Sequence, residues 1–244
     1  MDHTLASDLA SLAGARIFFA HQSVGENILE GLRELVRGAG HDIPIVDVGT
    51  AGPLPQACVL HARIGQNERP LTKCADFRRL VDGELAESID IALLKFCYID
   101  INGETDVEGL FDVYRTTLDE FSRRRPGTTF VPVTAPIRHV PGGPGVWARE
   151  LLGRPNHSKI ANRKRHAFND LLRRTYADRP VFDIAASEST YADGRRERFS
   201  YDGVACDNLI TAYTDDGGHL NARGRAMVAR DLVRCLAEVV AERT

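Results

Sequence analysis

The chain has 244 residues, of which 43% are hydrophobic and 27% are charged, and its formal net charge is -3. This composition is that of a globular protein with a sizeable core, and it argues against a nucleic-acid partner, because phosphate binding needs clustered excess Lys and Arg. No apolar run approaches the roughly 20 residues that cross a bilayer, and the N-terminal stretch lacks the apolar segment of a secretory signal. Five scattered cysteines fit reduced thiols. We therefore expect a cytoplasmic protein without a membrane partner.

Apolar, β-branched runs alternate with stretches of helical period along the chain. The runs predict buried strands at 15–20, 43–49, 89–97, 128–135 and 180–185. The periodic stretches predict helices at 25–37, 73–87, 107–124, 159–177 and 221–242. This alternation favours a parallel sheet with helices on both faces. Residues 1–244 contain no repeat and no linker-like break, so we interpret them as one domain.

Two segments, 136–158 and 185–218, are too long to be simple connections. The second contains Asp202-Gly203, a pair that favours a tight turn in a short hairpin. Both segments follow predicted strands, and ligands of open α/β sheets bind beyond the carboxyl ends of the strands. We therefore expect both segments to reach that rim, together with Ser23, which follows the first strand.

Ser23 has three interpretations that the turn alone does not separate. Its hydroxyl could cap the helix that follows, the turn could hold an anion at the helix N-terminus, or the hydroxyl could be a nucleophile that needs a neighbouring base. A base is available in Asp216-Gly-Gly-His219, just before the last helix. On a tight turn the carboxylate would accept the Nδ1 proton of His219 and leave Nε2 facing outward. Asp215 is a rival to Asp216, and the spacing from His219 favours Asp216.

These features resemble those of the SGNH (GDSL-type) hydrolase family: a serine after the first strand and a D-x-x-H pair before the last helix. The stretch 46–53 is similar to the family's second block, with its glycine at Gly52, and 133–138 resembles the exit from the fourth strand. The resemblance implies a flavodoxin-like three-layer α/β/α fold with a central parallel sheet. It also implies metal-independent hydrolysis of an ester through an acyl-enzyme on Ser23, with His219 as base and Asp216 as its orienting partner.

The oxyanion-binding block departs from the family pattern. Ile99 stands where the family has an asparagine, and an ionised Asp100 cannot donate a hydrogen bond. Besides the backbone amides of Ser23 and Gly52, we expect donors near Asn67, from its side-chain amide and from the backbone of Gly65. Losing one oxyanion donor typically costs on the order of 10²–10³ in rate, so an active enzyme needs a replacement.

The resulting hypothesis is an esterase that cleaves a short acyl group, with an O-acetyl ester of a small molecule or carbohydrate as the substrate class. Two alternatives stay open: an acyltransferase with the same triad, and a non-catalytic ligand-binding protein with this fold. The histidines show no H-x-H or H-E-x-x-H spacing, so we expect no catalytic metal and no cofactor. His21 is interpreted as a rim residue that contacts substrate.

Overall fold

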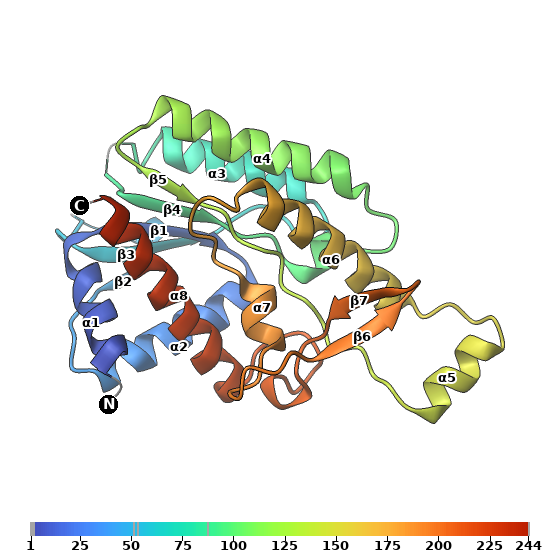
Figure 1. The fold of residues 1–244 in the computed structure, drawn as a ribbon. Coiled ribbons are helices and arrows are strands. Elements are labelled where there is room, and N and C mark those ends of the chain that lie inside the picture. The colour runs from blue at the N-terminus through green and yellow to red at the C-terminus, as the bar shows by residue number, and fades with distance from the viewer. Residues whose placement is uncertain (1–2, 51, 53, 87, 244) are drawn as a thin grey trace.

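A five-stranded sheet lies at the centre of the molecule (Figure 1). The computed structural model describes residues 3–50, 52, 54–86 and 88–243, with the backbone alone for His3 and 147–150. All strand pairs of the sheet are parallel, in the order β2-β3-β1-β4-β5. The strands are β1 (Arg16–His21), β2 (Ile45–Asp47), β3 (Cys58–Arg63), β4 (Ile91–Leu94) and β5 (Thr129–Val131).

Helices cover both faces of the sheet, so the predicted three-layer α/β/α fold is confirmed (Figure 1). One face carries α1 (His3–Ser11), α2 (Ser23–Gly38) and α8 (Ala222–Arg243), and the other carries α3 (Pro70–Asp82), α4 (Val107–Arg124) and α6 (His157–Thr175). Alternate β1 residues enter the two cores, with Phe19 on the α8 side and Phe18 on the α4 side. None of the described helices combines the length and apolarity needed to cross a membrane.

The structure differs from the predicted elements around β3 and after β5. β3 was not predicted, because His61 and Arg63 interrupt its apolar run. The strand predicted at 180–185 is wrong: only one parallel bridge forms there, between Val133 and Phe182. The chain then turns into α7 (Ile184–Ser189), because the Asp183 side chain caps that helix by accepting from the Ala186 amide. The segment 136–158 also contains a helix, α5 (Pro144–Leu151).

The segment 185–218 contains the predicted hairpin. Its strands β6 (Arg198–Tyr201) and β7 (Val204–Asp207) pair antiparallel. Asp202 and Gly203 join them with φ of 49° and 71°, the left-handed pair that a two-residue turn of this kind requires. The prediction for this turn is confirmed.

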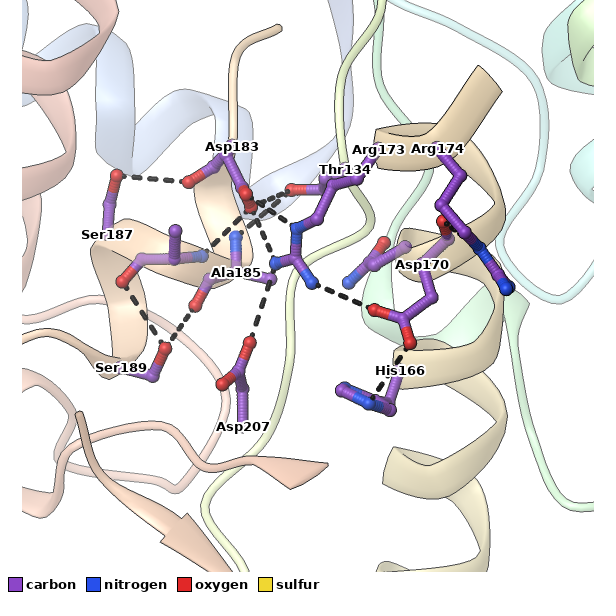
Figure 2. A network of polar contacts seen from close by, with 12 residues as sticks. Thr134, His166, Asp170, Arg173, Arg174, Asp183, Ala185, Ser187, Ser189 and Asp207 are labelled. Atoms are coloured by element: carbon purple, nitrogen blue, oxygen red, sulfur yellow. Dashed lines mark hydrogen bonds and ion pairs between the residues drawn. The ribbon is translucent and has the colours of Figure 1, made fainter. Parts of the chain in front are cut away.

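A half-buried ionic network fixes this hairpin and α7 to α6 (Figure 2). The Arg173 guanidinium donates to both oxygens of Asp183, at 2.7 and 2.9 Å, and to Asp207 at 3.4 Å. Thr134, which follows β5, donates to the same Asp183 carboxylate at 3.1 Å. One guanidinium therefore holds together the segments that lead from the sheet to the turn carrying His219.

Candidate active site

The turn between β1 and α2 presents the Ser23 hydroxyl at the carboxyl edge of the sheet. α2 begins at Ser23 with Gln22 as its N-cap residue, and no side chain caps the helix. The Gln22 amide instead donates to the carbonyls of Ile64 and Gly65, at 2.7 and 3.0 Å, and so joins this turn to the loop after β3. Ser23 is thus not the cap residue, and its hydroxyl is free to contact another side chain.

The turn before α8 holds His219 through the Asp216 carboxylate. Asp216 Oδ1 accepts from the backbone amides of Gly218 and His219, at 2.8 and 2.7 Å. Gly217 has a φ of 80°, which a larger residue adopts only with strain. Gly218 lies so close to the Tyr98 ring that an added Cβ would be 3.0 Å from it. The local sequence D-G-G-H therefore suits both the turn and the packing of Tyr98 against it.

Asp216, His219 and Ser23 form a continuous chain of hydrogen bonds. His219 Nδ1 lies 2.6 Å from Asp216 Oδ2, and His219 Nε2 lies 3.0 Å from Ser23 Oγ. The carboxylate can only accept, so Nδ1 carries the proton and Nε2 is the basic nitrogen that faces the hydroxyl. The hydrogen bond from His219, helped by two backbone amides, holds the pKa of Asp216 well below its usual range. Asp215 instead accepts from Asn221 and does not contact His219.

A buried ion pair lies beneath the neighbouring loop. Lys73 and Asp100 are both inaccessible to solvent, and Lys73 Nζ lies 2.5 Å from Asp100 Oδ2. Asp100 also accepts from the amides of Glu68 and Cys97, at 3.0 and 2.6 Å, and Cys97 Sγ lies 3.9 Å from Ser23 Oγ. The ion pair therefore connects the loop after β3 with the turn that contacts the serine. Asp100 acts only as an acceptor.

Besides the Ser23 amide, three oxyanion donors were expected, and the structure places them in different surroundings. Gly52 is exposed after β2, and β3 separates β2 from β1; among the described residues no hydrogen bond joins it to Ser23. The Gly65 amide donates to Asp76 Oδ2 at 2.8 Å, so the expectation that Gly65 donates to an oxyanion is wrong. Asn67 accepts from Lys73 Nζ at 3.2 Å. Because lysine can only donate, this contact identifies the carbonyl oxygen and leaves the Asn67 NH₂ group for another partner.

A buried histidine pair lies behind the serine turn. His21 is inaccessible, so its interpretation as a rim residue is wrong. Its Nδ1 faces the Gln22 carbonyl at 2.8 Å, and its Nε2 lies 3.2 Å from His61 Nδ1. Arg33 donates to His61 Nε2 at 3.4 Å, so the consistent tautomer pattern places a proton on His61 Nδ1, pointing at His21.

His21, His61 and Glu26 bring possible metal-ligating atoms within 4.8 Å of one another, a cluster that no sequence spacing indicated. Arg33 also pairs with Glu26 at 3.1 Å. Arg33 already balances the charge of Glu26 and donates to His61 Nε2. The cluster is therefore satisfied as a hydrogen-bonded network. Burial lowers the pKa of His21 to about 4, which keeps it neutral within this network.

Three residues of the site were not identified from the sequence. Lys73 shares the buried stripe of α3 with Phe77 and Leu80. A lysine at an apolar position of the helical period could have indicated a buried charge that needs a partner. Cys97 and Tyr98 directly precede Ile99 in the sequence, and no pattern there indicates that they contact Ser23 or His219. The Tyr98 ring lies edge-on to the His219 ring, with centroids 5.7 Å apart, so it forms a wall beside the base.

Comparisons with known proteins agree with this architecture. No family model and no curated protein matches the chain. A protein from Streptococcus pneumonia provisionally described as a platelet activating factor is similar in structure: the TM-score is 0.50 at 14% identity, over 94% of this chain and 89% of that one. A protein from Desulfitobacterium hafniense DCB-2 provisionally described as a lipolytic protein of the G-D-S-L family gives a TM-score of 0.49 at 11% identity, over 91% of this chain and 99% of that one. The first of these likenesses shows a shared fold, and the three-layer α/β/α fold predicted from the sequence is confirmed.

Proposed function

We propose that this protein is a serine hydrolase that cleaves a short acyl ester, such as an O-acetyl ester of a small molecule or carbohydrate. The chain of contacts Asp216–His219–Ser23, with separations of 2.6 and 3.0 Å, carries the proposal. Both separations lie within the range over which a base takes a proton from a positioned hydroxyl.

The reaction follows from the protonation states of these groups. His219 Nε2 takes the proton of Ser23 Oγ as that oxygen forms a bond to the ester carbonyl carbon. Collapse of the tetrahedral intermediate breaks the bond to the alcohol oxygen, which receives the proton from His219. Water then loses a proton to His219 as it attacks the acyl group on Ser23, and the carboxylic acid leaves as the proton returns to Oγ. Asp216, kept ionised by its hydrogen bonds, stabilises the imidazolium in both halves.

Two donors are proposed for the oxyanion. The Ser23 amide belongs to the first turn of α2, where backbone N–H groups have no acceptor inside the helix and the helix dipole is positive. The Asn67 NH₂ group is the second, oriented by Lys73 on its carbonyl side. The loop that carries Asn67 is tied to the serine turn through Gln22 and to the Cys97 turn through Asp100. Asn67 would thus replace the asparagine absent at Ile99.

The exposure of the base favours hydrolysis over acyl transfer. The His219 side chain is 42% exposed, so the proposed base lies open to solvent. An acyltransferase with the same triad needs water to lose this competition. Assays of acyl-donor consumption with and without alcohol acceptors separate the two functions.

Labelling with a fluorophosphonate probe tests the proposal. The wild type should be modified at one serine, and Ser23→Ala and His219→Asn should not be. Ser122→Ala is the matched control, because the Ser122 hydroxyl has no hydrogen-bond partner among the described residues. The same variants are assayed with 4-nitrophenyl acetate. Absence of labelling between pH 6 and 9 in folded wild type would favour the non-catalytic binding protein.

A further inference from the structure

An exposed arginine lies on the rim beside His219 and takes no part in the reaction described above. Arg138 Nε donates to the Gly217 carbonyl, within the catalytic turn, at 3.3 Å. Its guanidinium carbon lies 5.3 Å from the centre of the Tyr98 ring, the ring that contacts His219 edge-on. The guanidinium is therefore separated from the base by one aromatic ring.

The backbone and the supporting ring of Arg138 are fixed by buried groups. The fully buried Asn162 side chain accepts from the Arg138 amide at 3.1 Å and donates to the Arg138 carbonyl at 2.6 Å. Arg165 donates to the same Asn162 oxygen at 2.6 Å and to the Tyr98 carbonyl at 2.7 Å. One buried pair thus positions the Arg138 backbone and the Tyr98 residue on whose ring the guanidinium lies, and the Nε bond to Gly217 anchors the guanidinium itself.

The fork of this guanidinium is unused within the described part of the chain. No carboxylate there lies within 4.0 Å of Arg138, and its two terminal nitrogens donate to no protein atom. Arg225, by contrast, uses both terminal nitrogens on Glu30 and Glu34. A planar, permanently charged fork that is fixed and unpaired matches the geometry of a carboxylate or a phosphate.

We propose that Arg138 binds an anionic group, a carboxylate or a phosphate, on the alcohol half of the ester, an inference that rests on the proposed hydrolase function. The position of Arg138 relative to the base identifies that half. His219 returns its proton to the leaving alcohol, so the alcohol lies over His219, while the acyl carbonyl faces the Ser23 amide. Arg138 lies beyond Tyr98 on the His219 side and thus selects negatively charged alcohols or phenols.

Paired substrates test this selection. 4-Acetoxybenzoate carries a carboxylate on the leaving group, and its methyl ester is the neutral match. In the wild type, kcat/KM should favour the anionic ester about tenfold or more, since hydrogen bonds to a charged partner are the strong ones. Arg138→Gln should abolish most of that ratio, mainly through KM, and Arg138→Lys should restore part of it. The same comparison with 4-acetoxyphenyl phosphate shows whether the carboxylate or the phosphate ester loses more kcat/KM in Arg138→Gln.

Arg195→Gln is the control. The guanidinium carbon of Arg195 also lies over a tyrosine ring, 4.3 Å from the centre of Tyr191, but Arg195 is on the loop before β6. Its substitution should leave the ratio unchanged. Equal ratios in the wild type and Arg138→Gln, with Ser23→Ala inactive, would overturn the role of Arg138 and leave the hydrolase proposal standing.

A binding measurement that needs no turnover separates the two proposals. Calorimetric titration of Ser23→Ala with 4-acetoxybenzoate should show binding that Ser23→Ala/Arg138→Gln loses. Arg138-dependent binding alongside a wild type that cleaves none of the esters and takes no probe would overturn the hydrolase but keep the anion site. Equal binding by the two variants, or none by either, would overturn the anion site.

Discussion

Replacing Lys73 by methionine should remove a large part of the protein's free energy of unfolding. Lys73 and Asp100 are fully buried and 2.5 Å apart, so Lys73→Met leaves the carboxylate with the amides of Glu68 and Cys97 as its donors. Removing one partner of a buried ion pair costs about 3–5 kcal/mol, because the remaining charge is buried without compensation. Native domains are stable by only about 5–15 kcal/mol, so the loss should be plain.

Urea unfolding at pH 7, followed by circular dichroism, measures this loss. Lys73→Met/Asp100→Asn should recover part of it, because the amide carries no charge, although its single oxygen can accept from only one of the two backbone donors that Asp100 serves with different oxygens. Lys164→Met is the control, because Lys164 donates to the Thr105 carbonyl, and its loss should cost about 1 kcal/mol. A Lys73→Met variant within about 1 kcal/mol of the wild type would refute the reasoning that the buried charge depends on its partner.

Three further substitutions test the site and its support. Asn67→Asp keeps the acceptor for Lys73 but removes the NH₂ donor. The kcat for 4-nitrophenyl acetate should therefore fall on the order of 10²-fold, while the free energy of unfolding stays within about 1 kcal/mol of the wild type. A kcat near that of the wild type would exclude Asn67 as an oxyanion donor. His21 has a folded pKa of about 4 against 6.5 unfolded, so the unfolded chain binds more protons between these values and stability should drop by about 3 kcal/mol as pH falls from 6.5 to 4. His21→Gln should flatten that slope in urea titrations, and an unchanged slope would contradict the assignment. Gly25→Ala should destabilise by about 1–3 kcal/mol because its Cβ would lie 2.3 Å from that of His21, whereas Gly38→Ala, with open space, should be neutral or stabilising by thermal unfolding.

The layered architecture was predictable because its signals are local. Helices such as α4 and α8 bury one stripe, so the period in the sequence gives their position to within a few residues. β3 was missed because two of its six residues are a histidine and an arginine. The structure shows that His61 hydrogen-bonds to His21 in the buried network and that Arg63 is exposed, and neither fact is visible in the local sequence. The reverse error at 180–185 arose because an apolar run led into a helix cap at Asp183 instead of a strand.

The site shows the same division between local and distant determinants. The turn around Asp216 and His219 could be inferred because its geometry is set by four consecutive residues. The availability of an oxyanion donor could not, because it depends on side chains from other elements. Gly65 fails as a donor through a bond to Asp76, and Asn67 stays available through one to Lys73. No pattern in the intervening sequence indicates either hydrogen bond.

Ser23 and His219, the proposed nucleophile and base, lie 196 positions apart in the sequence. They meet only because α8 packs along α2, where Arg225 pairs with Glu30 and Glu34 and Asn27 accepts from the Leu220 amide. A nascent or truncated chain that has completed its first turns thus carries a serine with no base to activate it. The proposed reactivity therefore requires that α8 has been synthesised and has docked on α2.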